Sequence, residues 1–166
     1  MGSGKSTIGK ELAKALSWKF MDLDQSIVDQ CNMGIPQMFE KYGERVFRGM
    51  EARVLRSTMH DKDVIVATGG GAPCHHQNMQ WLKDHGHVIY LRLGPEELYQ
   101  RLKNESENRP LVAQMTDNEL SAYIENHLNQ RKAYYERAHE IVDGNGTISE
   151  IVDQIKSTLS IQENLT

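Results

Sequence analysis

Hydrophobic and polar residues follow a helical period in some segments of the chain and form unbroken apolar runs in others. After a glycine-rich start, Ile8, Leu12 and Leu16 recur every four residues, which predicts a helix with one buried stripe. The segment 39–59, "FEKYGERVFRGMEARVLRSTM", is also expected to be helical, with a break at Gly43. Val46, Met50 and Val54 are expected to lie on one face of this second helix.

Three further helices are marked by residues that favour helix initiation. Pro95 is well placed at the first position of one helix, where its missing N–H costs nothing. Thr116 with Glu119, and Thr147 with Glu150, have the spacing of capping boxes at the start of two others. The expected apolar positions are Leu98 and Leu102 in the first, Leu120, Ile124, Leu128 and Tyr135 in the second, and Ile148, Val152, Ile155 and Leu159 in the third.

Four short segments are predicted to be strands. The runs "VIVATGGG" (64–71) and "HVIYLRL" (87–93) are continuously apolar before their ends, as in strands covered on both faces, and "KFMDLD" (19–24) and "EIVD" (140–143) are shorter. Strands that alternate with helices predict an α/β fold in three layers, α/β/α, with a parallel sheet in the middle. Ligands of such folds bind at the carboxyl ends of the strands.

Composition narrows the class of protein. A chain of 166 residues without repeats or linkers is expected to form a single domain, residues 1–166. The net charge of −4 argues against nucleic-acid binding, and no apolar run is long enough to cross a bilayer. The two cysteines, Cys31 and Cys74, are too few for a disulfide framework and suit a reducing compartment, so the expected location is the cytoplasm.

The opening "MGSGKST" contains the second half of a phosphate-binding loop, G-x-x-x-x-G-K-[ST]. Backbone N–H groups from Gly2 to Ser6 and the positive end of the following helix would together attract phosphate oxygens. Lys5 would reach the β- and γ-phosphates of a nucleoside triphosphate, and the Ser6 hydroxyl would bind Mg²⁺. The alternative is a glycine turn that merely caps an ordinary helix.

The first half of that loop and the strand that normally precedes it are not in the sequence. The first glycine of the pattern would lie two places before Met1. We expect about ten further residues upstream in the natural protein, containing a central strand of the sheet.

Two aspartates and an arginine suggest what could receive the phosphate. Asp22 and Asp24 are expected at the end of a strand with both side chains on one face, because strand residues alternate. One carboxylate can serve the water shell of a metal, and the other can accept a proton from a hydroxyl group. Arg48 presents a planar fork that matches a carboxylate. The alternatives are a solvated strand end for the aspartates and a helix ion pair with Glu44 or Glu51 for the arginine.

Three more motifs follow along the chain. The glycines at 69–71 allow a ligand to approach the backbone closely, although they would equally suit a tight turn between a strand and a helix. Arg109 stands in "NRPL", inside a polar insertion, and Arg131 stands in "QRKAYYE" on a predicted helix, where an arginine is often just solvated.

In combination, these motifs closely resemble the shikimate kinase family. Its pattern is a phosphate-binding loop, D-x-D at the second strand, F-R-x-x-E, G-G-G, R-P-L in a lid, and R-x-x-x-Y near the end. The corresponding residues, in order over essentially the whole chain, are Gly4-Lys5-Ser6-Thr7, Asp22-Leu23-Asp24, Phe47-Arg48 with Glu51, Gly69-Gly70-Gly71, Arg109-Pro110-Leu111, and Arg131 with Tyr135.

The resemblance implies a P-loop kinase fold of the nucleoside-monophosphate-kinase type, with a substrate-binding region at about 24–59 and a lid at about 104–117. It implies ATP-dependent phosphorylation of the 3-hydroxyl of shikimate, giving shikimate 3-phosphate and ADP in the pathway to chorismate and the aromatic amino acids. It also implies a monomer with Mg²⁺ as cofactor. The partners implied are shikimate and ATP, with no nucleic acid and no membrane.

Residue roles follow from the same resemblance. The implied catalytic residues are Lys5, Asp24 and Arg109. The implied shikimate contacts are Asp24, Arg48, Gly69, Gly70, Gly71 and Arg131, with the two arginines on the carboxylate and Asp24 on the ring hydroxyls. The implied ATP contacts are Gly2, Ser3, Gly4, Lys5, Ser6, Thr7, Arg101 and Arg109, with the turn 143–146 also on the adenine side. Ser6 and Asp22 are the implied metal ligands.

Two other functions remain open on the sequence. One is a related P-loop kinase for a different small acceptor, such as gluconate, although Arg48, Arg131 and "DLD" favour shikimate. The other is a catalytically silent nucleotide-binding module, which the shortened loop would suit.

Overall fold

The structure is a computed structural model, and it describes residues 2–104 and 114–163. Two compact units are distinguished within the chain, Lys5–Val88 and Met1–Gly4 with Ile89–Thr166. We refer to them as the first and second unit and describe each by itself. The single domain expected over residues 1–166 stays a prediction.

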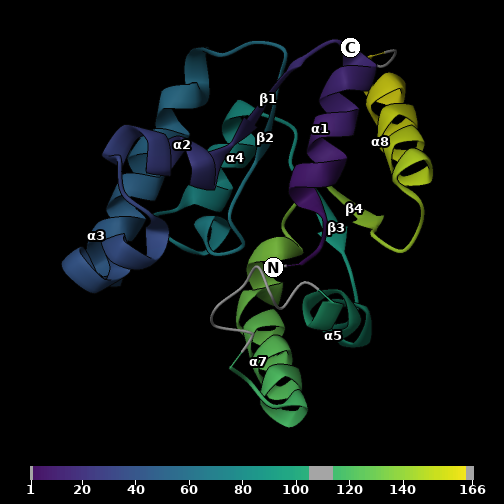
Figure 1. Ribbon diagram of the computed structural model, residues 1–166. Helices are drawn as coiled ribbons and strands as arrows, with labels where there is room; N and C mark the ends of the chain where they lie inside the picture. Colours follow the sequence, from purple (N-terminus) through teal and green to yellow (C-terminus); the bar gives the residue numbers. More distant parts are fainter. Residues whose placement is uncertain (1, 105–113, 164–166) are drawn as a thin grey trace. The chain divides into compact units, whose positions relative to one another are not determined.

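The first unit contains a pair of parallel strands and the helices around them (Figure 1). β1 pairs with β2 in a register that sets Lys19 opposite Val64 and Asp22 opposite Ala67. Figure 1 shows α2, α3 and α4 gathered beside these strands. The elements are α1 (Lys5–Leu16), β1 (Lys19–Asp22), α2 (Leu23–Cys31), α3 (Ile35–Ser57), the 3₁₀ turn η1 (Thr58–His60), β2 (Val64–Ala67), the 3₁₀ turn η2 (Ala72–Cys74) and α4 (Asn78–His85).

The core of the first unit joins α2 and α3 to the turn η2. The buried apolar residues of this cluster are Leu23, Ile27, Met38, Phe47, Val54, Leu55 and Ala72. Within α3 the chain kinks at Gly43, whose φ of 76° and ψ of 165° are not helical, so the predicted break is confirmed. Of the residues expected together on one face of α3, Val54 is buried and Val46 is exposed, and Phe47 and Glu51 are buried as well.

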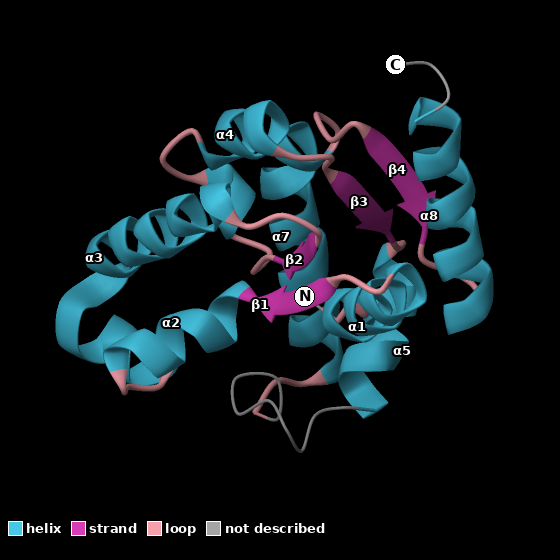
Figure 2. Ribbon diagram, turned by 90° about the horizontal axis from the view of Figure 1, so that it is seen from above, coloured by secondary structure: helices cyan, strands magenta, loops and turns pink. Residues whose placement is uncertain are grey.

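The second unit has its own parallel pair, β3 and β4, which sets Arg92 opposite Asp143. In Figure 2 these strands lie side by side, with α8 along β4. Leu98 and Leu102 of α5 form a core with Leu120 and Ile124 of α7. The elements are β3 (Ile89–Arg92), α5 (Pro95–Asn104), α7 (Asp117–Tyr135), β4 (Glu140–Asp143) and α8 (Ile148–Glu163).

The predicted helix starts in this unit are confirmed. Pro95 is the first residue of α5, and Thr116 and Glu119 exchange the hydrogen bonds of a capping box before α7. The Thr147 hydroxyl likewise donates to Glu150 at 2.8 Å, and the Glu150 N–H donates back to it. Ile148, expected on the last helix, is its first residue; its side chain is exposed, whereas Ile151 is buried.

The α/β class and the parallel pairing of the strands are confirmed. The continuous parallel sheet expected from the sequence stays a prediction, because the structure describes the two strand pairs separately. In the part of the chain that the structure describes, no helix combines the length and the apolar character needed to cross a membrane.

Candidate functional site

The glycine-rich loop leads directly into α1, as predicted. Gly4 has a φ of 81°, in the left-handed region that favours glycine, and Lys5 is the first residue of the helix. Ser6 and Thr7 lie exposed in its first turn. The backbone N–H groups and the positive dipole end of a helix N-terminus favour an anion at this position.

Ser6 and Asp22 come together although they are 16 residues apart. The Ser6 hydroxyl donates to Oδ2 of Asp22 at 2.6 Å. Hydroxyl and carboxylate oxygens are the ligands that Mg²⁺ prefers, and a serine can bind a metal through its lone pair while its proton is held by a carboxylate. These two residues therefore fit the cation that their motifs imply.

Asp22 also begins α2, and this corrects the expected geometry of the D-x-D motif. Its Oδ1 accepts the N–H groups of Asp24 at 3.1 Å and of Gln25 at 3.3 Å, which is the bonding of a helix N-cap. The strand consequently ends at Asp22, and Asp24 lies in the first helical turn. The prediction that both aspartates share one face of a strand is wrong.

Asp24 is directed toward the glycine turn after β2. If Gly69 carried a Cβ, that atom would lie 2.7 Å from Oδ1 of Asp24, closer than real Cβ atoms come. Burial raises the pKa of the Asp24 carboxyl and the neighbouring Asp22 raises it further, while Lys5 and Arg48 act in the opposite direction. A carboxylate with a raised pKa is a better proton acceptor than an ordinary surface aspartate.

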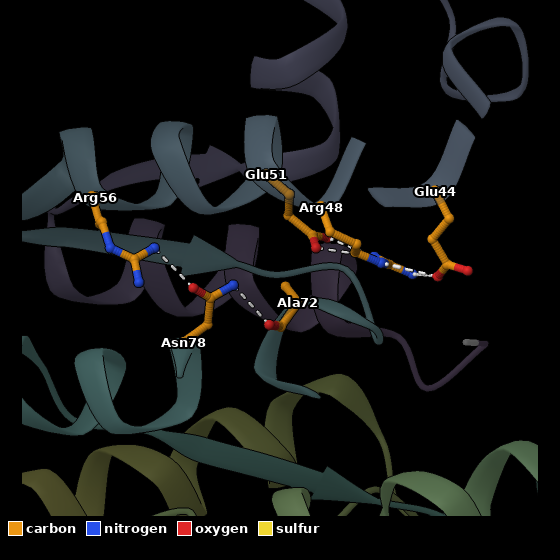
Figure 3. A network of polar contacts seen from close by, with 6 residues as sticks. All are labelled: Glu44, Arg48, Glu51, Arg56, Ala72 and Asn78. Atoms are coloured by element: carbon orange, nitrogen blue, oxygen red, sulfur yellow. Dashed lines mark hydrogen bonds and ion pairs between the residues drawn. The ribbon is translucent and has the colours of Figure 1, made fainter. Parts of the chain in front are cut away.

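Arg48 lies against the same glycine turn and is held by two glutamates of its own helix (Figure 3). Its Nη1 donates to Oε2 of Glu51 at 2.9 Å, and its Nη2 donates to Oε1 of Glu44 at 3.1 Å. Glu51 is buried, with 1% of its side chain exposed, whereas Glu44 is exposed. A Cβ on Gly71 would lie 2.6 Å from Nη2 of Arg48. The helix ion pairs of Arg48 with Glu44 and Glu51 are thus present, and they orient the guanidinium toward the turn.

The pairing of the strands explains why these distant residues meet. Because β1 and β2 are parallel with Asp22 opposite Ala67, the segments that follow both strands leave the sheet at one edge. One segment contains Asp24 and the other contains the glycines 69–71. The structure therefore brings together Ser6, Asp22, Asp24, Arg48 and the glycine turn within the first unit.

A second group of predicted residues meets in the second unit. Nη2 of Arg101 donates to the carbonyl of Gly144 at 2.9 Å, and its Nη1 lies 3.6 Å from where a Cβ on Gly4 would be. The turn 143–146 is shaped by Oδ1 of Asp143, which accepts the N–H of Asn145 at 2.9 Å. Arg101, Gly4 and this turn are thus neighbours within the second unit, as their expected common role at the nucleotide requires.

The structure does not test the expected contacts of two further arginines, Arg131 and Arg109. Arg131 lies on α7 in the second unit, where it and burial lower the pKa of His127, with burial the larger cause. Its pairing with Arg48 on one carboxylate stays a prediction. Arg109 and most of the predicted lid, 104–117, lie outside the described residues.

The sequence did not reveal two structural partners of the turn, Arg56 and Asn78. Arg56 stands eight residues after Arg48 on α3, and this helical spacing was the available signal. Asn78 begins α4, a helix that was not predicted, and the amphipathic segment after it was its only trace. The sequence pattern does not predict helix α2 either, because "KFMDLD" favours a strand through Asp24 whereas Asp22 caps the helix.

The known proteins to which this chain is similar belong to one family. A sequence model of the shikimate kinase family matches residues 1–160. The chain is 37% identical over 150 residues to the shikimate kinase of Parabacteroides distasonis, covering 90% of this chain and 87% of that protein. It is 37% identical over 163 residues to the shikimate kinase of Flavobacterium johnsoniae, covering 96% and 95%.

Solved structures give the same result. The crystal structure of shikimate kinase from Bacteroides thetaiotaomicron is similar with a TM-score of 0.92 and 31% identity, covering 96% of this chain and 94% of that one. Shikimate kinase from Acinetobacter baumannii in complex with shikimate is similar with a TM-score of 0.85 and 34% identity, covering 100% and 91%.

Proposed function

The chain belongs to the shikimate kinase family, and we propose that it transfers the γ-phosphoryl group of ATP to the 3-hydroxyl of shikimate. The products would be shikimate 3-phosphate and ADP, on the route to chorismate and the aromatic amino acids. The observation that carries the proposal is the convergence of Asp24 and Arg48 on the turn at Gly69 and Gly71. Membership of this family favours shikimate over gluconate as the acceptor. It also favours a kinase over a catalytically silent nucleotide-binding module.

The two ends of this site suit the two ends of the acceptor. The fork of Arg48 can bind the carboxylate of shikimate, because a guanidinium and a carboxylate match in two parallel hydrogen bonds. Asp24 can orient a ring hydroxyl and accept its proton as the phosphate bond forms. The bare backbone at Gly69 and Gly71 leaves room for both side chains, since a Cβ at either position would clash with one of them.

Phosphoryl transfer depends mainly on positioning and on stabilising negative charge. Lys5 and Arg109 are assigned here to the transferring phosphate, and Arg131 to the shikimate carboxylate together with Arg48. Ser6 and Asp22 would hold Mg²⁺, which neutralises phosphate charge when bound. The backbone from Gly2 to Thr7, with Arg101 and the turn at 143–146, would bind the remainder of ATP.

A direct test compares the affinities of the two substrates. In Arg48→Lys the charge beside Glu51 is kept and the fork is lost, so the Kd for shikimate should rise at least about tenfold. The Kd for ATP should change less than about twofold, because Arg48 is not assigned to the nucleotide. Calorimetric titration measures both constants without requiring turnover. An unchanged Kd for shikimate would remove Arg48 from the acceptor site and overturn the assignment.

The identity of the acceptor is tested by coupled ADP release with shikimate and with gluconate. Turnover is expected with shikimate only. The monomeric state and the cytoplasmic location remain predictions, the first of which size-exclusion chromatography with light scattering checks.

A further inference from the structure

We propose that Asn78 is a positioning residue for the acceptor site. Its buried side chain links α3, through Arg56, to the carbonyl of Ala72, and so holds the glycine turn against Asp24 and Arg48. This inference rests on the proposed function, because it assigns a role at the same site.

The side-chain amide of Asn78 makes two hydrogen bonds, one as a donor and one as an acceptor. The residue is fully buried, with 0% of its surface exposed. Its Nδ2 donates to the carbonyl of Ala72 at 2.9 Å, and its Oδ1 accepts from Nη1 of Arg56 at 2.9 Å (Figure 3). The backbone N–H of Asn78 donates to the carbonyl of His75 at 2.8 Å. Only a side chain with a donor and an acceptor at this length can make both links, since aspartate lacks the donor and leucine lacks both groups.

Arg56 ties this amide to the long helix. Besides Asn78, its Nη1 donates to the carbonyl of Ala52 at 2.9 Å, which fixes the guanidinium on α3. Its Nη2 donates to the carbonyl of His76 at 2.9 Å, so the segment after the turn is held at a second point. The guanidinium also lies 6.0 Å from the ring centre of Trp81 on α4.

The Ala72 carbonyl belongs to the same short turn as the two glycines. The N–H of Ala72 donates to the carbonyl of Gly69 at 3.1 Å, and the N–H of Cys74 donates to that of Gly71 at 3.0 Å. Ala72 is itself fully buried. A shift of its carbonyl would therefore be passed on to Gly69 and Gly71 through these tight backbone bonds.

A shift of the glycine turn would move Asp24 and Arg48, because these side chains lie directly against it. Asp24 and Arg48 approach the turn so closely that even a Cβ would not fit. Arg48 and Arg56 are eight residues apart on α3, about 12 Å along the helix axis. One helix thus presents an arginine for the acceptor and a second arginine that anchors the turn on which the acceptor rests.

The test uses Asn78→Asp in the full chain. The aspartate keeps the size of the side chain and an acceptor for Arg56, but it replaces the Nδ2 donor with an oxygen facing the Ala72 carbonyl. We expect the Kd for shikimate to rise about tenfold, since a small misplacement of binding groups has effects of this size or more. The Kd for ATP, measured in the same calorimeter, should stay within about twofold.

Thr58→Val is the matched control for a purely structural effect. Thr58 is buried near the end of α3, and its hydroxyl donates to the carbonyl of Leu55 at 2.7 Å. The variant loses a buried hydrogen bond of the same helix without touching the turn, so it should lower the Tm and leave both Kd values unchanged. Arg56→Lys breaks the same link from the other side and should also weaken shikimate binding. It provides the test if Asn78→Asp does not fold.

Two results would overturn the inference. One is a Kd for shikimate within about twofold of the original in both Asn78→Asp and Arg56→Lys. The other is an equal loss of shikimate affinity in Thr58→Val at the same fall in Tm. Arg48→Lys separates the two proposals, because an unchanged Kd there means that the acceptor site itself is wrong. A raised Kd in Arg48→Lys with no effect at Asn78 and Arg56 rejects this inference alone.

Discussion

The guanidinium of Arg48 occupies the space that a side chain on Gly71 would need. A Cβ at that position would lie 2.6 Å from Nη2 and 2.7 Å from Nη1. The φ of Gly71 is −85°, which any residue adopts, so the requirement for glycine is steric rather than conformational. The same holds at Gly69, where the obstructing group is the carboxylate of Asp24. Glycine is required at these two positions because the side chains of Asp24 and Arg48 lie against them.

Gly71→Ala should therefore displace Arg48 and weaken shikimate binding. The methyl group cannot be accommodated without moving the guanidinium, which would strain its ion pair with Glu51. We expect the Kd for shikimate to rise about tenfold or more and the Kd for ATP to stay within about twofold. Calorimetric titration of each substrate checks this, and wild-type shikimate affinity would contradict it.

Gly49→Ala is the matched control for that variant. Gly49 is next to Arg48 on α3, is exposed, and has nothing within 4 Å of the position of a Cβ. Alanine in the interior of a helix is favoured over glycine, so the free energy of unfolding should increase by about 0.5–1 kcal/mol. Thermal unfolding should show a higher Tm while shikimate affinity is unchanged. A loss of affinity here would mean that the Gly71 effect is not specific to the turn.

Elements with a strong local signal were predictable from the sequence. The apolar runs ending at Ala67 and Arg92 are strands, and the capping box of Thr116 and Glu119 starts a helix. The break at Gly43 was also predictable, because glycine is the residue that tolerates a positive φ inside a helical pattern. In each case the information lies within a few residues of the element.

At the D-x-D motif, the local sequence pattern is not sufficient to predict where the strand ends and the helix begins. "KFMDLD" continues to alternate through Asp24, so its period favours a longer strand, yet the Asp22 carboxylate caps a helix immediately afterwards. Periodicity does not reveal which of two local hydrogen-bonding options an aspartate takes. The role of Asn78 depends on Arg56, 22 residues away, and a single sequence contains no record of such a contact.

Replacing Asp24 by asparagine should stabilise the protein while it abolishes turnover. The pKa of the Asp24 carboxyl is raised, chiefly by burial and then by Asp22, so its ionised form is less favourable in the folded state than in the unfolded chain. Near pH 7 Asp24→Asn removes that unfavourable charge and should therefore raise the Tm. Catalysis should fall by at least about a hundredfold, because asparagine cannot accept the proton.

The difference in Tm between Asp24→Asn and the wild type should depend on pH. Between the unfolded pKa of aspartate and the raised pKa of Asp24, the folded protein binds more protons than the unfolded chain, so wild-type stability falls as the pH rises. The Tm advantage of Asp24→Asn should therefore be largest near neutral pH and should shrink as the pH is lowered through the raised pKa. Thermal unfolding from pH 4 to 8 measures it. A Tm advantage of Asp24→Asn that grows toward acid pH would mean that the pKa of Asp24 is lowered in the folded protein and not raised.

Arg101 is predicted to serve ATP and not shikimate. Its bond to the Gly144 carbonyl and its place beside Gly4 suit a side chain that lies along the nucleotide. Arg101→Met keeps the length of the side chain and removes the charge, so the Kd for ATP should rise about tenfold with little effect on shikimate. Lys103→Met, two residues along α5, removes an exposed cation that pairs with Asp117 at 2.8 Å and should leave ATP affinity unchanged. Equal effects in both variants would indicate only a general influence of positive charge.

Ser6 should determine how the enzyme responds to magnesium. Its hydroxyl is 2.6 Å from Asp22, and Ser6→Ala removes one of the two oxygens that fit the cation while the Asp22 cap on α2 remains. The Mg²⁺ concentration that gives half-maximal ADP formation should rise about 10–100-fold, the range seen when metal sites lose a supporting group. Ser6→Thr retains a hydroxyl at the same position, as the phosphate-binding motif allows, and should behave like the original protein. The Tm of all three proteins should agree within a few degrees, which separates loss of the metal from loss of the fold. A magnesium dependence that is identical in Ser6→Ala and the original would show that this hydroxyl serves only to hold Asp22.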